Sequence, residues 1–319
     1  MIAANCDGRS PIVVDSGNGL DVEFQSVAVR PIALGLHVSP TRQTRSLLVA
    51  SDTRTSTGKV SNRGTAQAPE NPHELRGSRF AAFVGTSGWA YSTWKPGFYP
   101  QATPQKKFLE YYATQLNSVE VNYTFRQLPT ANLLASWLAA SDDNFRFSFK
   151  APQRLTHVLR LKDCSTTIAA LAHALAPMMS AGRVGVVLFQ LPPDFKADVP
   201  RLETFLADAS GSGIRMAFEF RHSTWFYDQV YDALRQYGAT LCVAESDELE
   251  TPDVVTADFN CYRFRKSRYS AAQLDGIELT LRKRSANGEV FAYFKHEEQP
   301  TGAIRAVDML RRLQHGRQP

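Results

Sequence analysis

The nine residues Ala217-Phe-Glu-Phe-Arg-His-Ser-Thr-Trp225 decide how the rest of the chain is interpreted. They complete a run, residues 214–220, in which apolar residues alternate with Arg, Ala and Glu. Because side chains alternate faces along a strand, this run predicts a β-strand with one apolar and one charged face. The strand breaks at His222, and Ser223 or Thr224 can cap a helix that begins near Trp225. A Glu, an Arg and a His just before a helix are typical of the active-site rim of a β/α fold, although a buried Glu–Arg pair fits the same pattern.

The same alternation of strands and helices continues through residues 80–313. Seven further strands are predicted, at residues 80–85, 118–125, 145–150, 184–190, 239–243, within 254–264, and 290–295. Helices are predicted between them, at residues 104–116, 130–140, 165–179, 200–208, 224–237, 270–283 and 301–313. Residues 246–253 are acidic, contain Thr251-Pro252 and are too few for a normal helix, so this connection is expected to be a loop.

Eight strands that alternate with helices predict an α/β fold, the TIM (β/α)8 barrel. An open doubly wound sheet is the competing architecture. It would carry a long glycine-rich phosphate loop after the first strand, and Gly85-Thr-Ser-Gly88 is too short for that motif.

Composition sets the class of protein and the domain boundary. The chain has 319 residues, 43% hydrophobic and 21% charged, which is typical of a globular protein, and its net charge of +5 permits an anionic ligand. Its four cysteines form no CxxC pair and no apolar run approaches a membrane span, so a cytoplasmic location and no membrane partner are expected. Residues 1–79 are rich in Ser, Thr, Arg, Gly and Pro, which predicts a disordered extension before a barrel domain at residues 80–319.

Polar residues share one face in three of the predicted strands. Apolar side chains there point to the helices, which leaves an inward set of Glu120, Asn122, Arg146, Lys150, Glu219 and Arg221. Most of this set lies late in its strand, where parallel barrel strands converge on the C-terminal mouth. Charges at such depth persist when they are paired or bind a ligand, so these residues predict either an ion network or a hydrophilic site.

Further candidates follow the strands. Trp89 and Tyr91, after the first strand, can stack on a ring or pack over the barrel, and His157, after the third, can donate to an anion or cap a loop. His222 is the predicted proton-transfer residue because histidine changes charge near neutral pH. Arg263 opens a basic run of Arg263, Arg265, Lys266 and Arg268 after strand seven, which is either a solvated loop or a phosphate-binding element.

Seven motifs in order resemble the YecE-like family, also called domain of unknown function 72. They are VGTSGWAY (84–91), FYP (98–100), VEVN (119–122), FKAP (149–152), Thr156-His157, LFQLPP (188–193) and EFRHSTW (219–225). The resemblance covers about residues 80–313 and implies a TIM barrel without an established activity. The family often has Arg-x-His-Gly after strand seven and Asn-Asp after strand eight, where this chain has Arg263-Phe-Arg-Lys266 and Lys295-His296.

Several functions fit these residues. In an enzyme for a small, hydrophilic, anionic substrate, Glu120 or Glu219 is the acid or base with His222 assisting, and Lys150, Arg221 and Arg263 hold the anion. A nucleic-acid-binding or phosphodiester-cleaving barrel would use the basic loops and aromatic stacking. A glycosidase with a Glu120–Glu219 pair and a non-catalytic ligand sensor are further alternatives. The sequence identifies no cofactor, and scattered histidines make a metal site unexpected.

Overall fold

The computed structural model describes residues 82–246, 249–295 and 298–315. The predicted extension at residues 1–79, its boundary with the barrel, Cys6 and His296 lie outside these residues. Among the described residues, eight parallel strands form one sheet in the order β1-β8-β7-β6-β5-β4-β3-β2. They are β1 (Ala82–Thr86), β2 (Ser118–Val121), β3 (Arg146–Lys150), β4 (Val184–Gln190), β5 (Met216–Glu219), β6 (Thr240–Glu245), β7 (Phe259–Phe264) and β8 (Glu289–Phe294).

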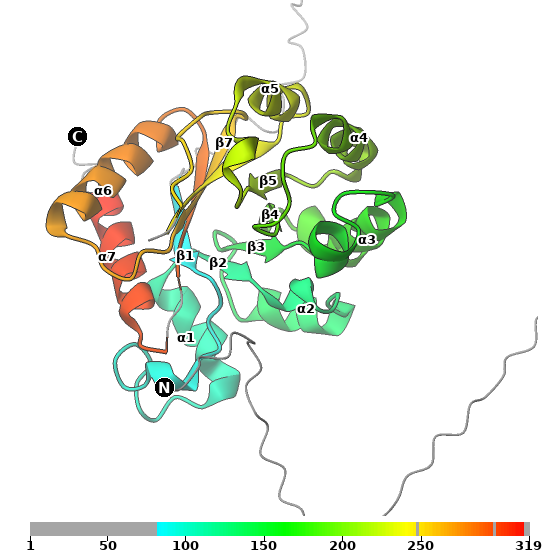
Figure 1. Ribbon diagram of the computed structural model, residues 1–319. Helices are drawn as coiled ribbons and strands as arrows, with labels where there is room; N and C mark the ends of the chain where they lie inside the picture. Colours follow the sequence, from blue (N-terminus) through cyan, green and yellow to red (C-terminus); the bar gives the residue numbers. More distant parts are fainter. Residues whose placement is uncertain (1–81, 247–248, 296–297, 316–319) are drawn as a thin grey trace, which may run out of the picture. The chain divides into compact units, whose positions relative to one another are not determined.

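Helices lie around the outside of these strands (Figure 1). They are α1 (Phe108–Gln115), α2 (Ala131–Ala139), α3 (Ser165–Ser180), α4 (Val199–Ala209), α5 (Asp228–Gln236), α6 (Ala271–Ser285) and α7 (Thr301–His315). The predicted (β/α)8 barrel is therefore confirmed. Within the described ranges, no helix has both the length and the apolar character needed to cross a membrane.

The boundaries of two predicted elements are wrong. The second strand ends at Val121 instead of residue 125, because the backbone turns helical at Asn122 and Tyr123–Phe125 form a 3-10 turn. The helix predicted from residue 224 begins at Asp228, after the 3-10 turn Ser223–Trp225. Thr224 does not cap that helix, since its hydroxyl accepts the N–H of Ala197. The loop predicted between β6 and β7 is confirmed for residues 246 and 249–258, where the structure has no α-helix.

Side chains close the barrel between its first two strands. The Asn117 amide acts as a substitute peptide group, since its oxygen accepts from Val84 N–H at 2.8 Å and its nitrogen donates to the Ala82 carbonyl at 3.0 Å. The Tyr112 hydroxyl accepts the N–H of Thr86 and donates to the carbonyl of Ser118. A parallel bridge between Ser87 and Glu120 completes the closure. Ser87 and Glu120 therefore lie side by side at the C-terminal end of the barrel.

The barrel interior is apolar at mid-height and charged at both ends. An apolar cluster fills the middle, with Phe83, Val186, Leu188, Ala217, Cys242, Phe259, Cys261, Phe291 and Tyr293. At the N-terminal end, the guanidinium of Arg146 lies 5.2 Å from the Phe83 ring, and that of Arg215 lies 5.0 Å from the Phe291 ring. At the C-terminal end, most inward residues two positions further along are polar, such as Gln190, Glu219 and Arg263, although Ala244 is apolar. Within the predicted inward set, Lys150 and Glu219 thus lie at the mouth and Arg146 lies at the opposite end.

Candidate functional site

Arg263 joins two carboxylates from different strands at the barrel mouth. Its Nη2 donates to Glu120 Oε1 at 2.7 Å, and its Nη1 donates to Glu219 Oε2. The three residues are each at most 4% exposed. Burial alone would lower the pKa of Arg263, but Glu120 and Glu219 more than offset this and hold it well above its usual value. Arg263, predicted to follow strand seven, is instead the penultimate residue of β7.

Other side chains complete the surroundings of Glu219. Gln190 donates to its Oε1 at 2.8 Å, and Arg265 Nη1 lies 3.8 Å from the same oxygen. Burial would raise the pKa of the Glu219 carboxyl, but Arg263 and Arg265 hold it below its usual value, so Glu219 is ionised at neutral pH. The Nε–H of Arg263 is buried and has no acceptor among the described residues. The site therefore has a buried N–H donor that no acceptor of the described residues satisfies.

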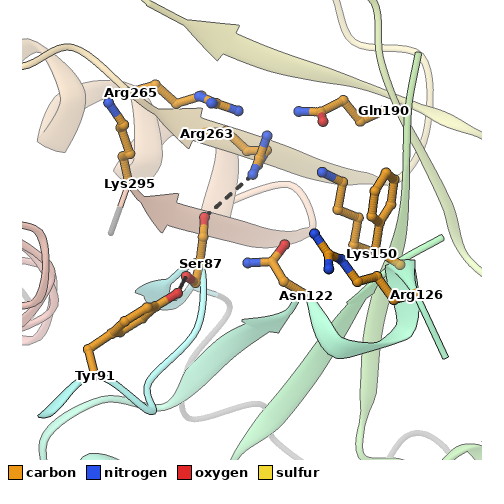
Figure 2. A pocket seen from close by; sticks show the side chains of 10 residues that line it. Ser87, Tyr91, Asn122, Arg126, Lys150, Gln190, Arg263, Arg265 and Lys295 are labelled. Carbon is orange, nitrogen blue, oxygen red and sulfur yellow. Dashed lines mark hydrogen bonds between the residues drawn. The ribbon is translucent and has the colours of Figure 1, made fainter. Parts of the chain in front are cut away.

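A cavity of about 370 Å³ opens above these residues. Its walls are Ser87, Tyr91, Asn122, Phe125, Arg126, Lys150, Gln190, Arg263, Arg265 and Lys295 (Figure 2). Five of these ten residues are Arg or Lys and none is acidic. Asn122, Lys150 and Arg263 come from different strands or strand ends, so the barrel itself fixes their relative positions. Such a cavity is suited to a small anion that can accept several hydrogen bonds.

Lys150 is a titratable group of this cavity whose pKa is strongly lowered. It is the last residue of β3, and its Nζ lies 4.3 Å from the centre of the Phe125 ring. Burial, followed by the nearby charge of Arg263, lowers the pKa of the amine to about 8. A desolvated lysine beside another cation is the usual setting of a reactive amine.

Tyr91 and Asn122, both candidates from the sequence, also line the cavity (Figure 2). The Tyr91 hydroxyl donates to the Ser87 carbonyl at 3.1 Å. Burial, aided by the negative charge of Glu120, raises the pKa of Tyr91 to about 12. Tyr91 therefore keeps its proton at neutral pH and acts as a hydrogen-bond donor.

The remaining predicted residues lie outside this cavity. Trp89 packs edge-on against Trp137 at 5.5 Å. Arg221 lines a neighbouring hollow of about 250 Å³ that Glu219 and Arg265 also border. His222 acts as a local cap, since its Nδ1 accepts the N–H of Thr224 at 3.2 Å.

His157 lies at the margin of the site. Its ring is edge-on to that of Phe125 at 5.2 Å, and its Nδ1 forms a hydrogen bond with Thr156 Oγ1. Burial, followed by the charges of Lys150 and Arg221, lowers the pKa of His157. Its imidazole is thus held near the cationic region without lining the cavity.

Six wall residues were not among the predicted site residues. They are Ser87, Phe125, Arg126, Gln190, Arg265 and Lys295. Gln190 could have been found by extending the inward alternation along β4, where Val186 and Leu188 are inward. Arg126 carries no such signal, because it follows the 3-10 turn after β2. The sequence placed Arg265 only in the basic run after strand seven and Lys295 only among the departures from the family pattern, although both continue the inward alternation of their strands.

The donor groups at this site do not favour a metal ion. No group of three or more His, Cys, Asp or Glu side chains in the described part of the chain could hold a metal ion. The cavity walls offer amine, guanidinium, amide and hydroxyl groups, which favour an anionic ligand over a cation.

Comparisons with known proteins agree with this architecture. The model of the family "Protein of unknown function DUF72" matches residues 83–319. The chain belongs to this family. A DUF72 family protein from Thermotoga maritima has 26% identity and a TM-score of 0.65, over 73% of this chain and 99% of that chain. A family member from Enterococcus faecalis has 17% identity and a TM-score of 0.62, over 73% of this chain and 95% of that one, which supports the fold alone.

Curated relatives share shorter regions. The UPF0759 protein YecE of Escherichia coli is 30% identical over 146 residues, which are 45% of this chain and 50% of that protein. YunF of Bacillus subtilis is 26% identical over 185 residues, 54% of this chain and 64% of the relative. The match thus spans about half the length of YecE. None of these names states a reaction, so function must be inferred from the site.

Proposed function

We propose that this DUF72 barrel is an enzyme for a small, hydrophilic, anionic substrate that binds in the mouth cavity and undergoes acid–base chemistry there. The observation that carries the proposal is the charge of the cavity wall, five cations and no carboxylate among its ten residues. Cations held this close together repel one another, and a bound anion relieves that repulsion. Arginine also presents paired donors that match carboxylate and phosphate oxygens.

The two buried glutamates have a supporting role in this proposal. Both are bonded to Arg263, and both are nearly inaccessible to solvent. A carboxylate whose pKa is held low is a weak proton acceptor, so Glu219 is better suited to fixing Arg263 than to carrying a proton. We therefore assign Glu120 and Glu219 to positioning Arg263 for the anion.

Lys150 is the proposed proton carrier. A general base is most effective when its pKa lies near the working pH, and a pKa of about 8 satisfies this condition. His222, the residue favoured from the sequence, is engaged with Thr224 outside the cavity. The substrate would lie between Lys150 and the guanidinium of Arg263.

Ligand binding tests this proposal. Isothermal titration calorimetry of the full chain should detect binding of inorganic phosphate or of members of a panel of small carboxylates and sugar phosphates, but not of neutral glycerol. Arg265→Gln should weaken binding at least tenfold, because Arg265 lines the cavity. Arg311→Gln is the matched control, since Arg311 is exposed on α7 outside this cavity. Equal affinities for the wild type and Arg265→Gln would contradict the proposal.

Nucleic acid is the alternative ligand predicted from the basic residues. The wall cations converge on a volume of about 370 Å³, which suits one small molecule better than several nucleotides. We expect a labelled single-stranded oligonucleotide to show no binding at physiological salt. Tight binding that weakens steeply with rising salt would favour the nucleic-acid alternative.

A further inference from the structure

We propose that Lys150 is a nucleophile, and that it forms an imine with the carbonyl carbon of a small anionic aldehyde or ketone, such as a 2-oxo acid. The inference rests on the proposed function and names its substrate class. It assigns to Lys150 a covalent step in addition to proton transfer.

The position of the amine supports this role. Lys150 ends a strand of the barrel, and its amine end points into the cavity between Gln190 and Arg263 (Figure 2). Its Nζ contacts the face of the Phe125 ring. Among the described residues, it forms no ion pair with any carboxylate and no hydrogen bond with any acceptor. The lone pair of the neutral amine is therefore not engaged by a protein group.

Burial makes a neutral amine common at Lys150. Arg263 and Arg265 also disfavour the ammonium form, and Glu120 and Glu219 only partly oppose these effects on the pKa. With a pKa of about 8, roughly one amine in ten is neutral at pH 7, about 300 times the fraction for an ordinary lysine of pKa 10.5. Only the neutral form attacks a carbonyl carbon, so burial, aided by Arg263, activates the nucleophile.

The same cations select the electrophile. A carboxylate or phosphate next to the carbonyl group would be held by Arg263, Arg265 and the second wall lysine, Lys295. The carbonyl carbon of the same ligand would then face the amine of Lys150. Lys295 is exposed to solvent, whereas the amine of Lys150 is desolvated, so the two lysines have different environments in one cavity.

The covalent step balances without an external oxidant or reductant. The amine nitrogen bonds to the carbonyl carbon, and the carbonyl oxygen leaves as water with the two hydrogens of the neutral amine. A proton from solvent converts the imine to the iminium, which draws electrons from the bonds next to the former carbonyl. Addition of water reverses these steps and releases Lys150.

Reductive trapping on the full chain tests the inference. Glyoxylate and acetaldehyde each form an imine that cyanoborohydride reduces to a stable secondary amine, and they differ in the carboxylate. Peptide mapping gives labelling at Lys150 relative to Lys162, an exposed lysine outside the cavity, in the same reaction. At pH 7 we expect the Lys150-to-Lys162 ratio to be at least tenfold higher with glyoxylate than with acetaldehyde. Equal ratios, or no label on Lys150, would overturn the inference.

Variants separate this inference from the proposed function. Lys150→Arg keeps the positive charge but cannot form an imine, so it should bind inorganic phosphate and lose the adduct. Arg265→Gln should lose the preference for glyoxylate over acetaldehyde in the labelling of Lys150. Lys162→Arg is the control and should change neither phosphate binding nor the labelling of Lys150. Wild-type protein that binds phosphate without trapping at Lys150 refutes the imine and leaves the anion site standing. Protein that does neither refutes both.

Discussion

Lys150, the proposed nucleophile, should lower the stability of the fold while it carries a charge. The fold places its amine beside Arg263 and away from solvent, and this lowers its pKa from 10.5 to about 8. The folded state therefore disfavours the charged amine, whereas the unfolded chain does not. Between about pH 8 and 10.5 the unfolded state binds more protons, so the stability of the folded state rises with pH across this window.

Lys150→Met should therefore be more stable than the wild type at pH 7. Methionine has a similar volume and carries no charge to desolvate. The difference in unfolding free energy should shrink as pH rises from 8 toward 10.5, because the wild-type amine becomes neutral in both states. Urea unfolding at several pH values measures it, with the exposed Lys162→Met as control. A wild type that is more stable at pH 7, or a pH-independent difference, would refute this explanation.

The charge of Arg263, unlike that of Lys150, should stabilise the fold, because it compensates the charges of Glu120 and Glu219. Arg263→Met leaves two buried carboxylates without their partner and should destabilise the fold by about 3–5 kcal/mol. Glu219→Gln should cost less, since Glu120 still pairs with Arg263. Thermal and denaturant unfolding show which of the two variants loses more stability. A more severe loss for Glu219→Gln would show that Arg263 is not the centre of the cluster.

Acid titration provides an independent measurement of the same cluster. The pKa of Glu219 is below its ordinary value in the folded state. Ionised Glu219 therefore stabilises the fold fully above the ordinary pKa, and this stabilisation is lost as the pH falls through the lower pKa of the folded state. Glu219→Gln should therefore flatten the acid limb of the stability–pH curve. An unchanged acid limb would mean that Glu219 is not held ionised by its neighbours.

At the scale of elements, the closure between β1 and β2 depends on side chains. Asn117→Asp keeps an acceptor for Val84 N–H but removes the donor to the Ala82 carbonyl, so it should cost about 1–3 kcal/mol. Hydrogen exchange at β1 amides should increase at the same time. Asn144→Asp, at an exposed position, is the matched control. Unchanged exchange at Val84 in Asn117→Asp would show that the amide does not close the barrel.

Alternation of apolar and polar residues predicted the strands well, because each strand is buried on its outer face against helices. It failed where a short turn replaced regular structure. Residue 122 fits the alternation of β2 but has a helical backbone, and the helix after β5 starts later than its capping residues suggested. Such turns are set by tertiary hydrogen bonds, as between Thr224 and Ala197, which the local sequence does not reveal.

At the scale of the whole molecule, strand alternation predicted that Glu120, Lys150, Glu219 and Arg221 meet at the mouth. The first three lie at this end of the barrel, whereas Arg221 borders the neighbouring hollow. The alternation could not show that Arg263 pairs with both carboxylates. Pairing is a property of distances across the barrel, and these follow from the register of all eight strands. For the same reason, the sequence favoured Glu219 as the chemical centre, whereas the structure directs attention to Lys150.

The central claim is that the mouth cavity holds an anion next to a readily deprotonated Lys150. Pulse acetylation of the full chain with acetic anhydride, followed by peptide mapping, tests both parts at once. We predict that the Lys150 labelling rate rises with a midpoint near pH 8, and that inorganic phosphate slows it without slowing Lys162. A Lys150 midpoint equal to that of Lys162, together with no protection by phosphate, would contradict the claim.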